Sequence, residues 1–262
     1  MLKIRDLHIA FDGTEAVRGI DLDMAPGECL GLVGESGSGK TVTALTVAGL
    51  LSRGKAEVSG TVEFEGVDLL HCKRETLRSI QGSAVSMVFQ EPMTSLDPTM
   101  RVGRQVEESL LLHTKLSAAE RRARALEVMA AVELPEPEAC YQKYPHQLSG
   151  GQRQRAMIAS AIVSRPKLLI ADEPTTALDV TVQAQILKLL RRINAESGMG
   201  ILFISHDLNV VRRLCSRVAV MRRGEIVETG ETEKIYAAPQ AAYTKQLIAA
   251  IPRIGGREGG AP

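Results

Sequence analysis

The chain has 262 residues, of which 44% are apolar and only 3% aromatic, a length that suits one large domain or a domain with an inserted subdomain. Lysine and arginine number 32 and aspartate and glutamate 31, which gives a formal net charge of +1. The overall charge therefore gives no support for a surface that binds nucleic acid or anionic lipid, and we predict no nucleic-acid partner.

The chain begins with alternating apolar and polar residues, the pattern of strands that bury one face. LKIRDLHIAF at Leu2–Phe11 is followed by a turn at Asp12-Gly13, and the strand-like IDLDM at Ile20–Met24 comes next. We therefore predict antiparallel strands in this first part of the chain.

Continuously apolar runs follow. The run ECLGLVG at Glu28–Gly34 predicts a strand buried on both faces, and a glycine-rich loop joins it to a helical stretch at Thr41–Leu51. Further buried strands are predicted at Ala84–Phe89, Lys167–Asp172 and Gly200–Ser205, with helical stretches between them. This alternation indicates the α/β class with a mostly parallel core sheet.

The middle of the chain is helical. The helical pattern runs from Gly103 to Val132, and Ser117 and Glu120 have the spacing of a capping box at a helix start. We place an inserted helical subdomain at about residues 91–165, inside a single domain that spans residues 1–250.

Towards the end, VAVMRRGEIVETG at Val218–Gly230 predicts a hairpin that turns at Arg223-Gly224. Residues 251–262 include GGREGGAP, which is too poor in apolar residues to pack, so we expect a flexible C-terminal tail.

The cysteines show no C-x-x-C spacing, so neither a zinc site nor a disulfide framework is predicted, and a reducing compartment fits best. They are Cys29, Cys72, Cys140 and Cys215. No signal sequence precedes Leu2–Phe11, and no stretch approaches the ~18 apolar residues that a transmembrane helix needs. If the protein works at a membrane, another chain must supply the membrane part.

A phosphate-binding motif lies at Gly34–Thr41, where GESGSGKT fits G-x-x-x-x-G-K-[ST]. Its glycines let backbone N–H groups surround a β-phosphate, and the helix N-terminus adds positive potential. Lys40 would reach the β- and γ-oxygens, and Thr41 would bind Mg²⁺. The buried strand before the loop and the helix after it favour a nucleotide site over a plain turn. The predicted nucleotide contacts are Gly34, Glu35, Ser36, Gly37, Ser38, Gly39, Lys40 and Thr41.

Polar residues follow three of the predicted buried strands, at the edge where ligands bind in open α/β sheets. Asp172 would hold Mg²⁺, and Glu173 is the candidate general base. Gln90 and His206 could reach the γ-phosphate and, for Gln90, the metal. Taken singly, Gln90 and His206 are each better explained as a satisfied polar cap, and a solvated acidic pair is the minor alternative for Asp172 and Glu173. Together, these residues predict a catalytic group.

A second glycine motif, LSGGQRQR at Leu148–Arg155, opens another predicted helix. Gly150 and Gly151 would allow an anion to approach the free N–H groups there. A helix end contributes roughly 0.3–1 kcal/mol to anion binding, whereas millimolar affinity needs about 4 kcal/mol. This motif must therefore complete a site formed elsewhere, and we expect it to do so across a two-fold or pseudo-two-fold dimer.

With TALD at Thr176–Asp179, these motifs resemble the nucleotide-binding domain of the ATP-binding cassette (ABC) family over about residues 1–250. The resemblance implies ATP and Mg²⁺ as cofactors, with ATP held between the Walker A loop of one domain and the signature of its partner. It implies these roles: Gly34–Thr41 as Walker A loop, Leu168–Glu173 as Walker B strand, Gln90 as Q-loop glutamine, Ser149, Gly150, Gly151 and Gln152 as signature, Asp179 as D-loop aspartate and His206 as switch histidine.

Phe11 lies ahead of the loop, where members of the family place an aromatic ring that stacks on adenine. Such stacking is worth about 1–3 kcal/mol per base. Because Phe11 also ends an alternating strand, a place in the core is an open alternative.

Three segments resemble a narrower group, the importer ATPases for peptides and nickel: Phe89–Met100, Ala171–Leu187 and Pro239–Pro252. In the first, Pro92 and Pro98 predict a stiff turn. In the family this surface receives a short cytoplasmic helix of the transmembrane partner. An ordinary connecting loop is the alternative.

The resemblance implies an energy-coupling ATPase of a bacterial importer, peripheral at the cytoplasmic face of the inner membrane. Its partners would be a second ATPase subunit, either a copy or a paralogue, two permeases docking near Gln90–Met100, and an extracytoplasmic binding protein. Many peptide-transporting members carry a C-terminal cysteine cluster that this sequence lacks, so peptides and nickel or metal chelates both remain possible cargo. The alternative function is an accessory ATPase of a soluble enzyme complex.

Overall fold

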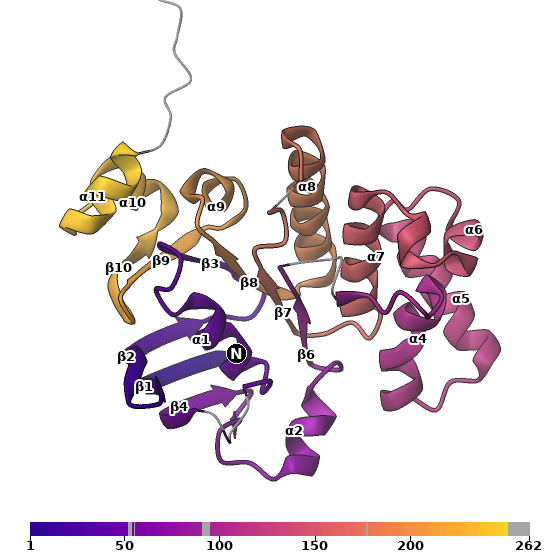
Figure 1. Ribbon diagram of the computed structural model, residues 1–262, viewed down its shortest axis with the longest axis horizontal. Helices are drawn as coiled ribbons and strands as arrows, with labels where there is room; N and C mark the ends of the chain where they lie inside the picture. Colours follow the sequence, from indigo (N-terminus) through magenta and orange to yellow (C-terminus); the bar gives the residue numbers. More distant parts are fainter. Residues whose placement is uncertain (52–53, 55, 91–94, 177, 251–262) are drawn as a thin grey trace, which may run out of the picture.

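Two β-sheets with surrounding helices form the fold (Figure 1). The structure, a computed structural model, describes residues 1–51, 54, 56–90, 95–176 and 178–250. The predictions for Pro92 and for a flexible tail at 251–262 lie outside these described residues. Among the described helices, none combines the length and apolar character needed to cross a bilayer.

The first sheet is antiparallel, as predicted, with strand order β2-β1-β4-β5. Its strands are β1 (Leu2–Phe11), β2 (Thr14–Met24), β4 (Glu57–Phe64) and β5 (Val67–Asp68). The sequence did not predict β4, because Gly60 interrupts its alternating pattern. This glycine has φ +94°, and a Cβ there would lie 2.2 Å from the carbonyl oxygen of Asp6. The pairing of β1 with β4 is irregular at this point, so only glycine fits.

The second sheet has six strands in the order β10-β9-β3-β8-β7-β6. They are β3 (Cys29–Val33), β6 (Val85–Val88), β7 (Leu168–Asp172), β8 (Gly200–Ser205), β9 (Arg217–Arg222) and β10 (Glu225–Glu231). All neighbouring pairs are parallel except β9 and β10, which form the predicted hairpin. Its turn residues Arg223 and Gly224 have φ of +50° and +87°, as tight hairpin turns require. The mostly parallel core sheet is confirmed.

Strand β3 is buried on both faces, as its continuous apolar run predicts. Leu30 and Leu32 face one hydrophobic core, which the sheet shares with the antiparallel sheet. Cys29 and Val33 face the other, which contains residues of the long helices. The central sheet therefore lies between two cores and is held rigidly, so the loops at its edges have a fixed frame.

The helices are α1 (Lys40–Val47), α2 (Arg74–Ile80), α4 (Val102–His113), α5 (Ala118–Ala131), α6 (Pro137–Gln142), the short 3-10 helix η1 (Pro145–Gln147), α7 (Gly150–Ile162), α8 (Val180–Ser197), α9 (Leu208–Leu214), α10 (Thr232–Ala237) and α11 (Ala242–Ala249). Helix α1 is shorter than predicted, because Gly49 takes φ +67° and ends it. The capping box of α5 is confirmed, with Ser117 Oγ accepting from the Glu120 N–H.

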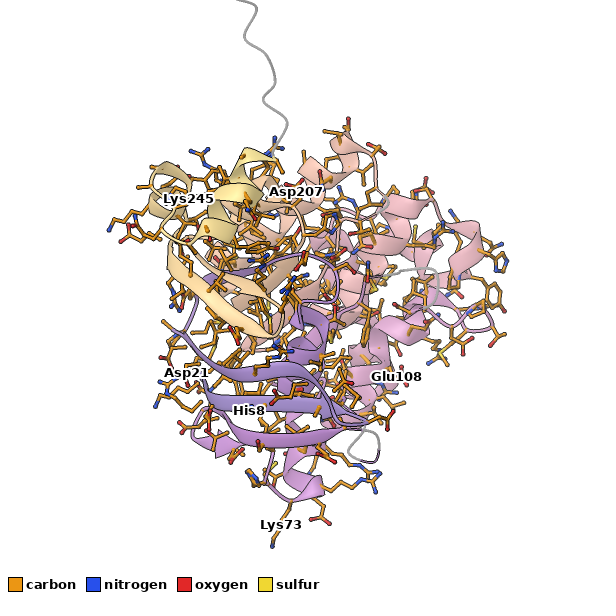
Figure 2. All side chains as sticks on the ribbon, turned by 60° about the vertical axis from the view of Figure 1, so that its left-hand side comes forward. His8, Asp21, Lys73, Glu108, Asp207 and Lys245 are labelled. Carbon is orange, nitrogen blue, oxygen red and sulfur yellow. The ribbon has the colours of Figure 1, made fainter. Side chains whose placement is uncertain are left out.

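Helices α4, α5, α6 and α7 contact one another on the side of β6 and β7 away from α1 (Figure 1). We retain the helical subdomain at about 91–165 as our proposal for how the domain is organised. Helix α11, which carries Lys245, lies at the opposite end of the molecule from Lys73, which precedes α2 (Figure 2).

Candidate nucleotide-binding site

The predicted catalytic side chains meet at Glu173, directly after β7. Nε2 of Gln90, which follows β6, donates a hydrogen bond to Oε2 of Glu173 at 3.1 Å. Nδ1 of His206, which follows β8, lies 3.0 Å from Oε1. The hydroxyl of Thr176 donates to Oε2 at 2.9 Å. The three residues named from the sequence therefore lie in direct contact, and Thr176 joins them without having been predicted.

Glu173 also has an unusual backbone. Its φ is +45°, a region that non-glycine residues seldom occupy. The strain is sustained because its N–H donates to the carbonyl oxygen of Ile204 at 3.0 Å, which fixes the end of β7 against β8. Its side chain is 14% exposed. Strained backbone of this kind is found preferentially at functional sites, where it aims a side chain that the strand direction alone would misplace.

Asp172 is the last residue of β7 and is 3% exposed. The hydroxyl of Thr41 donates to its Oδ1 at 3.3 Å. Burial raises the pKa of the Asp172 carboxyl, and the nearby Glu173 raises it further. A carboxylate in such surroundings is stabilised by a cation, and a buried carboxylate beside a hydroxyl matches the oxygen ligands of Mg²⁺. Thr41 and Asp172 therefore fit the metal, and with Gln90 they line a cavity of about 560 Å³.

Lys40 is 5% exposed at the start of α1. Its Nζ donates to the carbonyl oxygens of Gly34 and Glu35 at 2.9 and 2.8 Å. Desolvation by burial lowers the pKa of its ammonium group. The ammonium group is thus held inside the loop by the backbone, where a phosphate would be within reach of the same side chain.

Two loop glycines also serve the packing of the chain. A Cβ on Gly34 would lie 2.0 Å from the carbonyl oxygen of Met221, and one on Gly39 would lie 2.6 Å from that of Ala16. Gly39 has φ +104° in addition. The loop is therefore fixed closely on β9 and β2, which gives its N–H groups a defined direction.

The signature residues form the start of α7. The Oγ of Ser149 accepts from the Gln152 N–H at 3.3 Å, and Oε1 of Gln152 accepts from the Ser149 N–H at 3.0 Å. This is a capping box, and S-G-G-Q has the S/T-x-x-E/Q spacing that would have predicted it from sequence. Ser149 and Gln152 thus build the helix end that exposes the glycines.

The two glycines of the signature have different surroundings. A Cβ on Gly151 would lie 3.1 Å from Val182, whereas one on Gly150 would have no atom within 4 Å. Among the described residues, the signature makes no hydrogen bond or ion pair with the Gly34–Thr41 loop. Nothing in the described chain therefore requires a glycine at position 150.

The remaining site predictions are placed less closely. Asp179 caps α8, its Oδ1 accepting from the Val182 N–H at 2.9 Å, and its neighbour Val180 is 75% exposed. Phe11 is half-buried at the end of β1 and packs against the core of the antiparallel sheet. This contact accounts for Phe11 as a core residue, and stacking on adenine stays a prediction.

Known proteins are similar to this chain in sequence and in fold. Residues 17–176 match the ABC transporter family. The chain is 51% identical to the peptidoglycan transport ATP-binding protein YejF of Agrobacterium fabrum and 46% identical to the dipeptide transport ATP-binding protein DppD of Lactococcus lactis. Each alignment covers 97% of this chain, but it spans only 47% of YejF and 74% of DppD.

Among solved structures, the chain resembles a dimeric post-hydrolysis state of the ATP-binding cassette MJ0796 bound to ADP and Pi. The TM-score is 0.79 at 30% identity, covering 88% of this chain and 99% of that one. The sequence match extends over more than half of the chain, and the fold agrees with it. The chain therefore belongs to the ABC transporter family, as one of its ATP-binding cassettes.

Proposed function

We propose that this chain is the energy-coupling ATPase of a bacterial peptide importer and that it works in pairs at the cytoplasmic face of the inner membrane. The observation that carries the proposal is the division of the site. Glu173 and its contacts lie at one edge of the central sheet, whereas the signature makes no hydrogen bond or ion pair with the described Gly34–Thr41 loop. Two such chains, facing each other, would complete each other's sites.

ATP hydrolysis is the activity of this family of cassettes. The described residues can perform its separate steps. The loop N–H groups and Lys40 bind the phosphates. Glu173 accepts a proton from the attacking water, while Gln90 and His206 hold its carboxylate in position. Thr41, Asp172 and Gln90 would hold Mg²⁺, which supplies positive charge to the phosphate oxygens when it is bound.

Gly150 supports the pairing of two cassettes. Its open surroundings leave room for an incoming phosphate. Val180, next to Asp179, exposes an apolar side chain. Such exposed apolar residues are typical of surfaces that another protein covers. The dimeric form of the MJ0796 cassette is consistent with the same arrangement. The partner would be either a copy of this chain or a paralogue.

The Gly150→Ala variant tests this role. Alanine favours a helix by up to about 1 kcal/mol over glycine, so the melting temperature should be unchanged or slightly higher. ATP affinity of the separate subunit should also be unchanged, because the phosphate loop is untouched. The assembled ATPase should slow by up to about fivefold, since a helix end contributes up to ~1 kcal/mol to a bound anion. Thermal melts, equilibrium ATP binding and steady-state ATPase assays measure these three quantities. Full turnover would contradict a signature that acts in trans.

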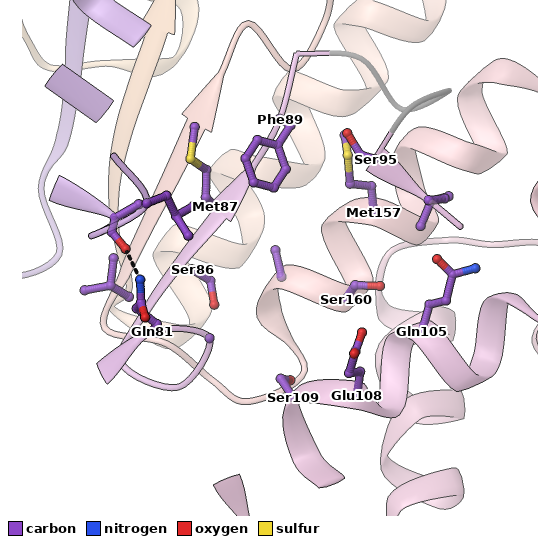
Figure 3. A pocket seen from close by; sticks show the side chains of 16 residues that line it. Gln81, Ser86, Met87, Phe89, Ser95, Gln105, Glu108, Ser109, Met157 and Ser160 are labelled. Atoms are coloured by element: carbon purple, nitrogen blue, oxygen red, sulfur yellow. Dashed lines mark hydrogen bonds between the residues drawn. The ribbon is translucent and has the colours of Figure 1, made fainter. Parts of the chain in front are cut away.

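A groove next to the nucleotide site is our proposed docking surface for a permease. It encloses about 250 Å³ between β6, α4 and α7, and Phe89, which is 40% exposed, lies at it with Met87 and Met157 (Figure 3). Glu108 is the one charged side chain among its described lining residues. A permease helix with an apolar side and a basic residue would match this surface. Phe89, which lines the groove, directly precedes Gln90 in the chain, so docking there would be coupled to the γ-phosphate.

Peptide cargo is our proposal on the strength of the relatives. The two named above are ATP-binding proteins of dipeptide and peptidoglycan transport. Both names point to compounds with peptide bonds, which favours peptides over nickel chelates for this chain. The external binding protein of the system would select the cargo.

Purification of the tagged chain from detergent-solubilised membranes tests the proposed function. We expect two polytopic membrane proteins and a second ATPase subunit to be recovered with it, and ATPase activity that rises with a peptide-loaded binding protein in proteoliposomes. Recovery with a soluble enzyme and no membrane protein would instead support the accessory-subunit alternative.

A further inference from the structure

Two segments from the C-terminal part of the chain hold the Walker A loop. The backbone N–H of Glu35 donates to the hydroxyl of Tyr243, in α11, at 2.9 Å. The N–H of Gly224, in the β9–β10 turn, donates to the carbonyl oxygen of Ser38 at 3.0 Å. The loop is thus fixed at two points by residues that lie far away in sequence.

The side chain of Tyr243 is itself held firmly. It is 9% exposed, and the guanidinium carbon of Arg222 lies 4.7 Å from the centre of its ring. Such a cation–π contact fixes the plane of a ring. The start of α11 is anchored as well, because the carboxylate of Glu228 accepts from the N–H groups of Gln240 and Ala241 at 2.8 and 3.0 Å. The hydroxyl is therefore presented to Glu35 from a rigid support.

The bond from Glu35 bears on the phosphate site through Lys40. The N–H of Glu35 is held by Tyr243, and the carbonyl oxygen of the same residue accepts from Nζ of Lys40 at 2.8 Å. Residues 35–37 are otherwise exposed, and Gly37 has φ +78° with open space around it. A loop of this composition has several conformations of similar energy. A fixed Glu35 reduces that choice and orders the groups that meet a phosphate.

We propose that Tyr243 is a positioning residue for nucleotide binding, through which α11 holds the Walker A loop in its ATP-binding conformation. This inference rests on the proposed ATPase function. Tyr243 lies beyond the part of the chain that matches the ABC transporter family, which ends at residue 176.

The Tyr243→Phe variant tests the proposal, because it removes one hydroxyl and keeps the ring under Arg222. The chain offers a matched control in Tyr236→Phe. Tyr236 also lies beneath an arginine, Arg212, at 4.5 Å, but its hydroxyl bonds to Asn209 and not to the loop. Both variants should keep the melting temperature of the full-length wild-type chain to within a few degrees.

Equilibrium binding of a fluorescent ATP analogue and steady-state ATPase assays provide the readouts. We expect Tyr243→Phe to raise the Kd for the analogue and the KM for ATP about three- to tenfold, with kcat changed by less than about twofold. Tyr236→Phe should leave all three at wild-type values. Equal affinities in the two variants would overturn the positioning role, as would a loss of kcat that follows a lowered melting temperature. Failure of the wild-type chain to bind the analogue would instead refute the proposed function.

Discussion

Replacing Glu173 with glutamine should reduce kcat for ATP hydrolysis at least ~100-fold while ATP still binds. Glutamine has the same shape, and its carbonyl oxygen can keep a bond from Gln90 or Thr176, which now contact the Oε2 atom. It cannot take a proton from water, and a general base contributes roughly 10²–10⁴-fold to a rate. Steady-state turnover and nucleotide binding, measured on the same preparation, separate the two effects.

Glu28→Gln is the matched control for this variant. Its side chain is 14% exposed, as is that of Glu173, and it accepts a bond from Nε of Arg217 at 2.7 Å. Because Glu28 precedes β3, it lies at the sheet edge away from the nucleotide site. We expect turnover near the wild-type value. Retained turnover in Glu173→Gln would exclude Glu173 as the base, and loss in both variants would point to a general effect of removing a buried charge.

Replacing Lys40 with alanine should weaken nucleotide binding itself, by roughly ten- to a hundredfold. Hydrogen bonds from a charged group contribute about 1.5–3 kcal/mol, and each 1.4 kcal/mol is a factor of ten in affinity. The variant also loses the bonds to Gly34 and Glu35 that now hold the ammonium group inside the loop. Titration with a fluorescent ATP analogue measures the affinity, and a thermal melt measures any unfolding.

Lys167→Ala serves as the control for Lys40→Ala. The Lys167 side chain is 64% exposed and pairs with Glu65 at 2.6 Å, at the start of β7 and thus at the other end of the strand from Asp172. Its replacement should leave ATP affinity unchanged, since exposed ion pairs contribute little. Unaltered affinity in Lys40→Ala would contradict the assignment of the loop lysine.

The central sheet could be predicted because its strands are continuously apolar. The Glu28–Gly34 and Gly200–Ser205 runs became β3 and β8, which neighbour each other in the sheet. Strand β4 was not predicted, because Gly60 interrupts its alternating pattern and the irregularity that this glycine serves lies in the neighbouring strand β1. A local sequence pattern thus identifies an element whose conformation depends on its own residues, but not one whose residues are determined by a neighbouring strand.

The candidate site also contains features that the sequence predicts and one contact that it does not. The positions of Gln90, Glu173 and His206 after predicted buried strands identified them, and their contact follows from the rule that parallel strands end at one edge of the sheet. The S-x-x-Q spacing at Ser149–Gln152 indicates a capping box, which our prediction of this helix did not include. The bond from Glu35 to Tyr243 joins residues 208 positions apart, so no local pattern could reveal it.

Because the signature makes no hydrogen bond or ion pair with the described Gly34–Thr41 loop, we expect the activity of the protein to depend on its dilution. A single cassette would bind nucleotide but would lack the signature of a partner subunit. It would therefore hydrolyse little ATP before it is assembled. Specific activity should then climb steeply with subunit concentration until pairing saturates. Hydrolysis would thus be controlled by association of the subunits, with no separate inhibitor.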